Sequence, residues 1–186
     1  MITSLGKTFM ADAAAGVELA WDRFGVDGAG VPLLLCLAER REVVVLDHRG
    51  HGESTKLGTL DGYSVSRLAA DLIALIDAEI GGPVDLLGHS MGGAISIDVT
   101  LARPDLVRSL ILMDTTGWSF RPDDPATADM YATFMADLDP TRGLPDLSAM
   151  EGPEEALIAA ATPAAWQQLK EVRSASFDPW AMKALG

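Results

Sequence analysis

The sequence is poor in cysteine, in positive charge and in long apolar runs. One cysteine among 186 residues cannot form an internal disulfide, which excludes a disulfide-stabilised scaffold and fits a reducing compartment. Fourteen Lys and Arg residues stand against 27 Asp and Glu residues, and the net charge of −13 disfavours a nucleic-acid partner. The longest apolar stretch, Val31–Ala38, is far shorter than the roughly 20 residues of a membrane span. Since residues 1–15 also show no secretory signal pattern, we expect a cytoplasmic protein without a membrane partner.

The composition that remains is that of a folded domain. Hydrophobic residues make up 48% and charged residues 22%, which is typical of globular proteins and argues against disorder. A length of 186 residues predicts one domain, or one domain with a partial addition. Residues 1–116 alternate short apolar runs with turn signals, whereas residues 117–186 are rich in Ala, Pro, Asp and Met. We therefore expect a core in residues 1–116 and a helical segment in residues 117–186.

The first region has the pattern of an α/β fold. Two weakly alternating runs predict antiparallel strands, and several continuous apolar runs predict strands that are buried on both faces. Apolar residues at three-to-four spacing predict helices between the later strands, which implies a parallel sheet with right-handed crossovers. The expected strands are Lys7–Asp12, Val17–Phe24, Val31–Cys36, Glu42–Leu46, Val84–Leu87 and Val107–Met113. The expected helices are Val65–Ile76, Met91–Ala102 and, in the second region, Pro125–Asp137, Glu154–Ala161 and Pro163–Ser174.

The strongest chemical signal is the segment Gly88–Gly93, which lies between an expected strand and an expected helix. G-x-S-x-G in this setting is the signature of a nucleophile elbow, a sharp turn that exposes a serine above the sheet. Glycines two residues before and after the serine are expected to avoid side-chain collisions in such a turn. Ser90 is the candidate nucleophile, and the backbone N–H of Met91, at the helix start, is a candidate oxyanion donor. The alternative is an ordinary tight loop with a solvent-exposed serine.

A second motif, Asp47–Ser54, follows the expected strand Glu42–Leu46. Its glycines allow a compact loop in which charged side chains can pair. Asp47, His48 and His51 could ligate a metal, but zinc needs about four ligands, or three and a water, and no further Cys or His lies at suitable spacing. We therefore favour a loop that is locked by an Asp–Arg ion pair, and we expect neither a metal nor an organic cofactor.

Three segments together resemble the α/β-hydrolase superfamily: D-x-R-G-H-G-x-S at residues 47–54, G-H-S-M-G-G at residues 88–93 and R-S-L-I-L-M-D at residues 108–114. They are most similar to its small bacterial serine esterases, lactonases, cofactor-free haloperoxidase-type enzymes and carbon–carbon bond hydrolases. The resemblance implies a partial α/β-hydrolase fold with a cap-like C-terminal segment. It also implies that Ser90 is a nucleophile, that Met91 supplies one oxyanion N–H, and that the substrate is a small apolar ester, lactone or related acyl compound.

The histidines depart from the family pattern. A serine hydrolase of this family places an acid and then a histidine after its nucleophile, and the histidine takes the serine proton. All three histidines here, His48, His51 and His89, precede Ser90, so the usual triad is not completed within these 186 residues. Asp114 lies where some family members carry the acid, but without a base we favour a structural role for it.

The link between two expected parallel strands is the second departure. Only Leu37–Arg41 joins Val31–Cys36 to the next strand, whereas a parallel crossover takes a dozen or more residues. The loop that supplies the other oxyanion N–H in the family is therefore expected to be missing, Cys36 to be a buried apolar residue, and activity to be impaired. The alternatives are a non-catalytic binding protein and a truncated fragment. A second copy or a complementing chain could complete the sheet.

Overall fold

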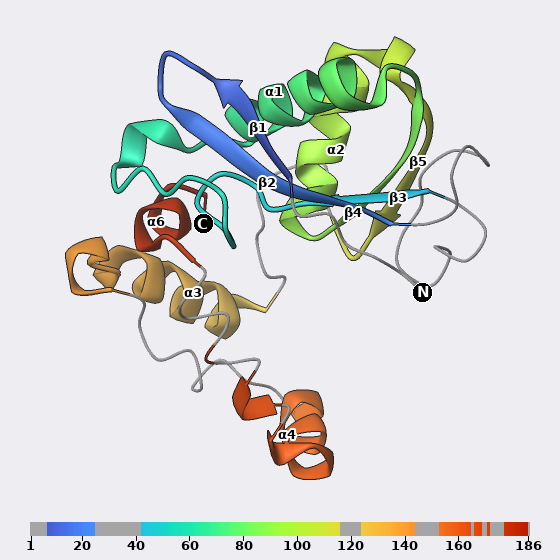
Figure 1. Ribbon diagram of the computed structural model, residues 1–186. Coiled ribbons are helices and arrows are strands. Elements are labelled where there is room, and N and C mark those ends of the chain that lie inside the picture. Colours follow the sequence, from blue (N-terminus) through green and yellow to red (C-terminus); the bar gives the residue numbers. More distant parts are fainter. Residues whose placement is uncertain are drawn as a thin grey trace.

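The computed structural model describes residues 7–24, 42–115, 124–143, 153–164, 166–168, 171 and 177–185. The described strands form two sheets, one antiparallel and one parallel (Figure 1). The first sheet contains β1 (Lys7–Asp12), β2 (Val17–Phe24) and β3 (Val43–Leu46) in that order, each antiparallel to its neighbour. The second contains β4 (Val84–His89) and β5 (Val107–Met113), which run parallel as expected.

Two helices, α1 (Val65–Leu75) and α2 (Met91–Ala102), pack beside each other next to the parallel sheet. Helix α2 is the crossover between β4 and β5 and contacts both strands. The helices and the parallel strands share one apolar core. Fully burying a large apolar side chain stabilises a fold by about 1.5–3 kcal/mol, and this core therefore holds β4 and β5 in place beside α2. That core contains Leu68, Ala69, Ile76, Val84, Leu86, Ile95, Val99 and Leu106.

Local sequence signals explain where α1 begins and ends. The Ser64 hydroxyl accepts a hydrogen bond from the backbone N–H of Arg67 at 3.2 Å, as an N-cap serine does. After α1 the chain makes one π-helical turn, Ile76–Ile80, and stops at Gly81, whose φ of 76° is left-handed. Both ends of the helical segment thus coincide with local signals, a serine before it and a glycine after it. Shorter 3-10 turns lie at Leu60–Gly62, Pro104–Leu106 and Pro140–Arg142.

The bounds of most early elements agree with the expectation. The antiparallel pair β1 and β2 and the helix α2 have the predicted limits. Strand β4 runs to His89, two residues beyond its predicted end, because Gly88 and His89 still pair with β5. The partner of β3 was not predicted: β3 lies antiparallel to β2, with Val43 opposite Phe24. The expected strand Val31–Cys36, the link that follows it and the Cys36 side chain lie outside the described residues.

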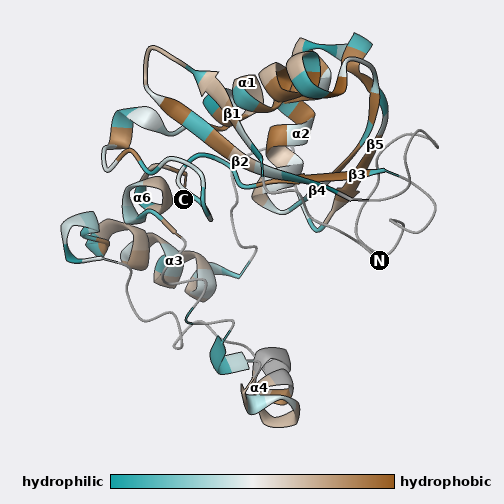
Figure 2. Ribbon diagram, in the orientation of Figure 1, coloured by the Kyte–Doolittle hydropathy of each residue, from teal (hydrophilic) through white to brown (hydrophobic). Residues whose placement is uncertain are grey.

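Three described helices follow β5, namely α3 (Pro125–Asp137), α4 (Pro153–Ala161) and α6 (Pro179–Leu185). In Figure 1, α3 and α4 lie away from the sheets, whereas α6 lies against the turn at Leu60–Gly62. Helices α3 and α4 were predicted to within one residue, α6 was not predicted, and the expected helix Pro163–Ser174 is described only in part. Helix α3 has no buried residue, and its residues are of mixed hydropathy (Figure 2).

Strand β5 presents apolar side chains to solvent. Ile111, Leu112 and Met113 are 37%, 44% and 48% exposed, and β5 pairs with β4 alone among the described strands. These exposed apolar side chains line an edge of the described parallel sheet, and such an edge favours association. Across the described ranges, no helix has the length and apolar character that crossing a bilayer requires.

Candidate functional site

The segment Gly88–Gly93 forms the sharp strand-to-helix turn that its sequence predicts. Strand β4 ends at His89, α2 begins at Met91, and Ser90 alone links them. The backbone angles of Ser90, φ 50° and ψ −121°, lie outside the regions that residues with a side chain normally adopt. Strain of this kind costs about 1–3 kcal/mol and persists only where the surrounding structure enforces it. Because Ser90 is exposed, the strained turn presents its side chain to solvent.

Two hydrogen bonds anchor Ser90 to the end of β5. Its backbone N–H donates to the Met113 carbonyl at 3.1 Å, and its carbonyl accepts from the Thr115 hydroxyl at 2.7 Å. Asp114, between these two partners, is the other described non-glycine residue with a positive φ, at 45°. The two strained residues thus follow adjacent parallel strands, in which His89 lies opposite Met113. The carboxyl edge of such a sheet is where α/β proteins bind their ligands.

The glycines of the turn are not equivalent. A Cβ atom at Gly88 would overlap the first turn of α2, and a Cβ atom at Gly93 would overlap the Thr115 side chain. A Cβ atom at Gly92 would meet no described atom within 4 Å. The expectation for the glycine two residues after Ser90 is therefore wrong, because it is Gly93 that faces the end of the neighbouring strand.

The backbone N–H of Met91 makes no hydrogen bond to another described residue. The first N–H groups of an α-helix have no intrahelical acceptor, and the helix dipole makes this end partly positive. Ser90 is the N-cap residue of α2, and its side chain makes no capping hydrogen bond. Within the described residues, both the Ser90 hydroxyl and the Met91 N–H therefore remain uncommitted.

The loop Asp47–Ser54 closes around its first residue. The Asp47 carboxylate accepts a hydrogen bond from the Glu53 N–H at 2.9 Å, and the Asp47 carbonyl accepts one from the Ser54 hydroxyl at 2.5 Å. Gly52 has a φ of 50°, and a side chain there would overlap the Asp47 carboxylate. The loop is compact, as predicted. In the part of the chain that the structure describes, no group of three or more His, Cys, Asp or Glu side chains is arranged to hold a metal.

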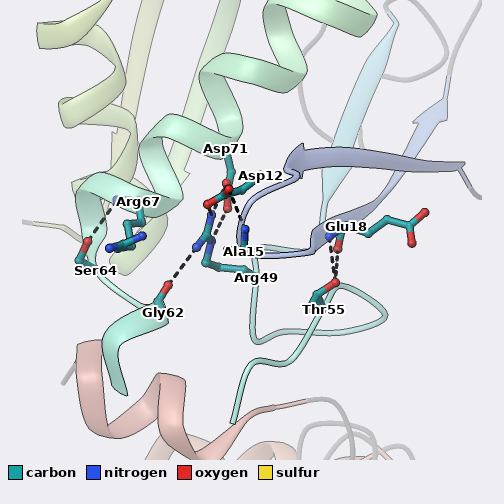
Figure 3. Close-up of polar contacts among 9 residues, drawn as sticks. All are labelled: Asp12, Ala15, Glu18, Arg49, Thr55, Gly62, Ser64, Arg67 and Asp71. Atoms are coloured by element: carbon teal, nitrogen blue, oxygen red, sulfur yellow. Dashed lines mark hydrogen bonds and ion pairs between the residues drawn. The ribbon is translucent and has the colours of Figure 1, made fainter. Parts of the chain in front are cut away.

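Arg49 pairs with an aspartate outside this loop. Its Nε and Nη2 atoms donate to the two carboxylate oxygens of Asp71 on α1, each at 2.6 Å (Figure 3). Both side chains are only 2% exposed. The Nη1 atom also donates to the Gly62 carbonyl at 3.0 Å, and the Asp12 carboxylate lies 3.7 Å from Nη2. The predicted Asp–Arg pair therefore exists with a different partner, because Asp47 is occupied by its own loop.

No histidine ring makes a hydrogen bond to the Ser90 hydroxyl within the described residues. His48 has a buried Nδ1 atom without a hydrogen-bond partner. Burial lowers the pKa of His48 to about 4, with a further lowering from His51 and an opposing effect from Asp47. Burial also lowers the pKa of His51, whose Nδ1 lies 3.1 Å from a backbone carbonyl. Both rings are therefore neutral at pH 7.

Asp178 and Ala181, near the end of the described chain, pack against this loop and the segment that follows it. The backbone N–H of Asp178 donates to the Gly50 carbonyl at 2.7 Å. The Asp178 carboxylate accepts from the Tyr63 hydroxyl at 2.5 Å and from the Gly58 N–H at 3.0 Å. Burial raises the pKa of Asp178, but these hydrogen bonds outweigh burial and leave the pKa below its ordinary value. Ala181 on α6 is fully buried beside Gly50. A Cβ atom at Gly50 would overlap the Ala181 side chain.

A cavity of about 150 Å³ lies between β3 and β4 and reaches the turn. Its lining is mostly apolar, and the polar residues among it are His48, Asp85, His89 and Ser96. Ser90 is not among the lining residues, although Gly88 and His89 are. The cavity therefore borders the candidate nucleophile without containing it.

Two parts of this site were missed by sequence reasoning. Helix α6 had a local signal, since Asp178 followed by Pro179 is typical of a helix start, and the Trp180 N–H donates to Asp178 Oδ1 at 3.0 Å. Thr115 had no local signal, because its partner Ser90 lies 25 positions earlier.

Comparison with known proteins agrees with this geometry. Residues 30–185 match the model of a family described as alpha/beta hydrolase fold. A 2-(acetamidomethylene)succinate hydrolase of Mesorhizobium japonicum is 39% identical over 85 residues, which are 46% of this chain and 30% of that protein. The dihydrolipoyllysine-residue acetyltransferase component of an acetoin cleaving system of Pseudomonas putida is 36% identical over 118 residues, which are 55% of this chain and 31% of that protein. The chain thus matches about a third of the length of these relatives.

Solved structures show the same fold. A hydrolase from Pseudomonas aeruginosa PA01 is similar with a TM-score of 0.67 at 21% identity, over 97% of this chain and 71% of that one. A likeness at this identity concerns the fold alone. Since one named relative is a hydrolase and the other an acetyltransferase component, the reaction has to be argued from the site.

Proposed function

The chain belongs to the alpha/beta hydrolase fold family, and on that premise we propose that it is a serine hydrolase unit with Ser90 as its nucleophile. The substrate is a small apolar ester, lactone or related acyl compound. The observation that carries the proposal is the backbone of Ser90, held at φ 50° directly before the free N-terminus of α2. In this proposal residues 1–116 are the hydrolase core and residues 117–186 are the cap-like segment.

The proposed reaction uses two adjacent groups of the turn. Ser90 Oγ bonds to the acyl carbon, and the substrate carbonyl oxygen becomes an oxyanion. The Met91 N–H donates to this oxyanion, and the partly positive end of α2 stabilises its charge. The alkoxide then leaves, and water hydrolyses the resulting acyl-enzyme.

We further propose that the 186-residue chain is slow on its own. No histidine follows Ser90 in the sequence, and none of the described histidine rings bonds to its hydroxyl. The serine proton must then pass to water, which forgoes the roughly 10²–10⁴-fold contribution of a general base. A base from a complementing polypeptide or from a second copy is expected to restore the rate.

The test is hydrolysis of p-nitrophenyl acetate and butyrate by the purified chain beside its Ser90→Ala variant. We expect slow turnover that disappears in Ser90→Ala, and acyl-enzyme detected on the peptide that contains Ser90 by mass spectrometry. A thermal melt on both proteins shows whether the variant is folded. Equal turnover in both folded proteins would remove Ser90 from the mechanism.

A second candidate function is non-catalytic binding of small apolar acids or esters. The apolar cavity between β3 and β4 favours it, since its volume of about 150 Å³ suits a small ring or short acyl chain. Calorimetric titration with short-chain fatty acids and their esters tests this function. Binding that is equal in the wild type and in Ser90→Ala, without turnover, supports it, and absence of heat for every ligand contradicts it.

A further inference from the structure

The Thr115 hydroxyl is committed to the backbone of the candidate elbow. It donates to the Ser90 carbonyl at 2.7 Å. The same carbonyl accepts from the Gly93 N–H at 2.9 Å and from the Ala94 N–H at 3.3 Å, which belong to the first turn of α2. Two separate elements, the start of α2 and the end of β5, therefore hold one carbonyl group.

This carbonyl shares a peptide group with the candidate oxyanion donor. A trans peptide is planar, and its carbonyl oxygen and its N–H point in opposite directions. The Ser90 carbonyl and the Met91 N–H form one such group, and the described residues contain no cis peptide bond. Whatever fixes the direction of the Ser90 carbonyl also fixes the direction of the Met91 N–H. A donor that is oriented in advance needs no rearrangement when charge develops on the substrate.

Two neighbouring residues make room for this contact. Asp114, at φ 45°, turns the chain after β5 and brings Thr115 toward the elbow. Gly93 lacks a side chain at the point where a Cβ atom would overlap the Cβ, the hydroxyl and the methyl group of Thr115. The strained residue and the glycine thus both serve to let Thr115 reach the Ser90 carbonyl.

We infer that Thr115 is a positioning residue for the Met91 N–H and acts through the peptide group between Ser90 and Met91. It touches neither the substrate nor the reacting atoms. The inference rests on the proposed function of this turn, and it adds a residue from the neighbouring strand to the oxyanion site.

The variants that test it differ by single groups. Thr115→Val removes the hydroxyl and keeps the shape, whereas Thr115→Ser keeps the hydroxyl. Thr100→Val is the matched control, because the Thr100 hydroxyl donates to the Ser96 carbonyl at 2.7 Å elsewhere on α2. A thermal melt of each variant separates loss of folding from loss of positioning.

The kinetic measurement is acylation of Ser90 by p-nitrophenyl butyrate, followed as released p-nitrophenolate and as the mass of the acyl-protein. The bond from Ser90 Oγ to the acyl carbon forms, the bond to p-nitrophenolate breaks, and the hydroxyl proton passes to water. We expect Thr115→Val to slow acylation roughly tenfold or more, and Thr115→Ser and Thr100→Val to stay within about threefold of the wild type. Acylation of folded Thr115→Val at the wild-type rate overturns the inference.

A second measurement does not depend on activity. In ¹⁵N-labelled protein, Thr115→Val is expected to shift the amide resonance of Met91 and to lower its order parameter, whereas Thr115→Ser is expected to preserve both. An unchanged Met91 amide in Thr115→Val overturns the inference. A wild type that is not acylated at Ser90 overturns the proposed function instead, and the amide resonance still decides the role of Thr115.

Discussion

Arg49 and Asp71 form a buried bidentate ion pair that joins the loop after β3 to helix α1. Each carboxylate oxygen of Asp71 accepts a hydrogen bond of 2.6 Å, and both side chains are 2% exposed. The same guanidinium donates a hydrogen bond to the Gly62 carbonyl and forms an ion pair with the Asp12 carboxylate (Figure 3). This pair therefore connects the antiparallel sheet to α1, and α1 packs against α2.

Removal of one partner of this pair is expected to be strongly destabilising. Asp71→Leu leaves the Arg49 guanidinium buried without its carboxylate, and a buried charge of this kind costs about 3–5 kcal/mol of unfolding free energy. The double variant Arg49→Met with Asp71→Leu is expected to recover most of that loss, because it buries no charge. Urea denaturation measures both. Arg103→Met is the control, since Arg103 is exposed beside Asp77 and Asp105, and such pairs contribute about 0–1 kcal/mol. Equal losses in Asp71→Leu and Arg103→Met contradict the prediction.

The stability of the protein is expected to fall as the pH drops from about 6.5 to about 4 because of His48. Its pKa is about 4 in the folded protein against an ordinary 6.5, so the unfolded chain takes up the proton first. The stabilisation is therefore complete above pH 6.5 and is lost progressively toward pH 4, on the order of 3 kcal/mol at most. Chemical denaturation across this range measures the slope. His48→Gln is expected to flatten it, and identical slopes in the two proteins would count against the buried neutral ring.

The two glycines after Ser90 are expected to respond oppositely to alanine. Gly93→Ala places a methyl group against Thr115 and is expected to lower the unfolding free energy by about 1–3 kcal/mol, as overpacking does. Gly92→Ala meets open space and is expected to stabilise α2 by up to about 1 kcal/mol, because alanine favours the helix. Thermal melts of both variants give the comparison. A tolerated Gly93→Ala would show that Thr115 can move aside.

Docking of α6 is expected to depend on the Asp178 carboxylate. Asp178→Ala removes the acceptor of the Tyr63 hydroxyl and of the Gly58 N–H, and hydrogen bonds to a charged group contribute about 1.5–3 kcal/mol. Trypsin cleavage after Lys183, in α6, is therefore expected to become about tenfold faster or more at pH 7.5. Asp124→Ala is the matched control, because Asp124 caps α3. Cleavage at the same rate in both variants would refute the role of Asp178.

The elbow and the early elements were predictable because their signals are short. Helix α2 runs between the predicted residues, since the motif Gly88–Gly93 marks its start and Pro104 follows its end. The family resemblance came from the same short segments and is shown by the match over residues 30–185. The roles of Ser90 and Met91 stay predictions that the experiments above decide.

Other features could not be predicted for lack of information at long range. The antiparallel partner of β3 depends on backbone edges that only meet in the folded chain, and the role assigned to Gly92 belongs to Gly93 because of Thr115. The bounds of α3 were predicted but not its surroundings, since apolar content alone does not say which side a helix buries, and α3 has no buried residue.

The sequence by itself determined most of the elements before α6, the sharp turn at Gly88–Gly93 and the family, because each rests on residues a few positions apart. Only the tertiary structure decided that Arg49 pairs with Asp71, that the Thr115 hydroxyl bonds to the Ser90 carbonyl, and that Asp178 accepts a hydrogen bond from Tyr63. These contacts span 22, 25 and 115 positions. Burial and shape select such partners once the chain is folded, and no local pattern of residues records that selection.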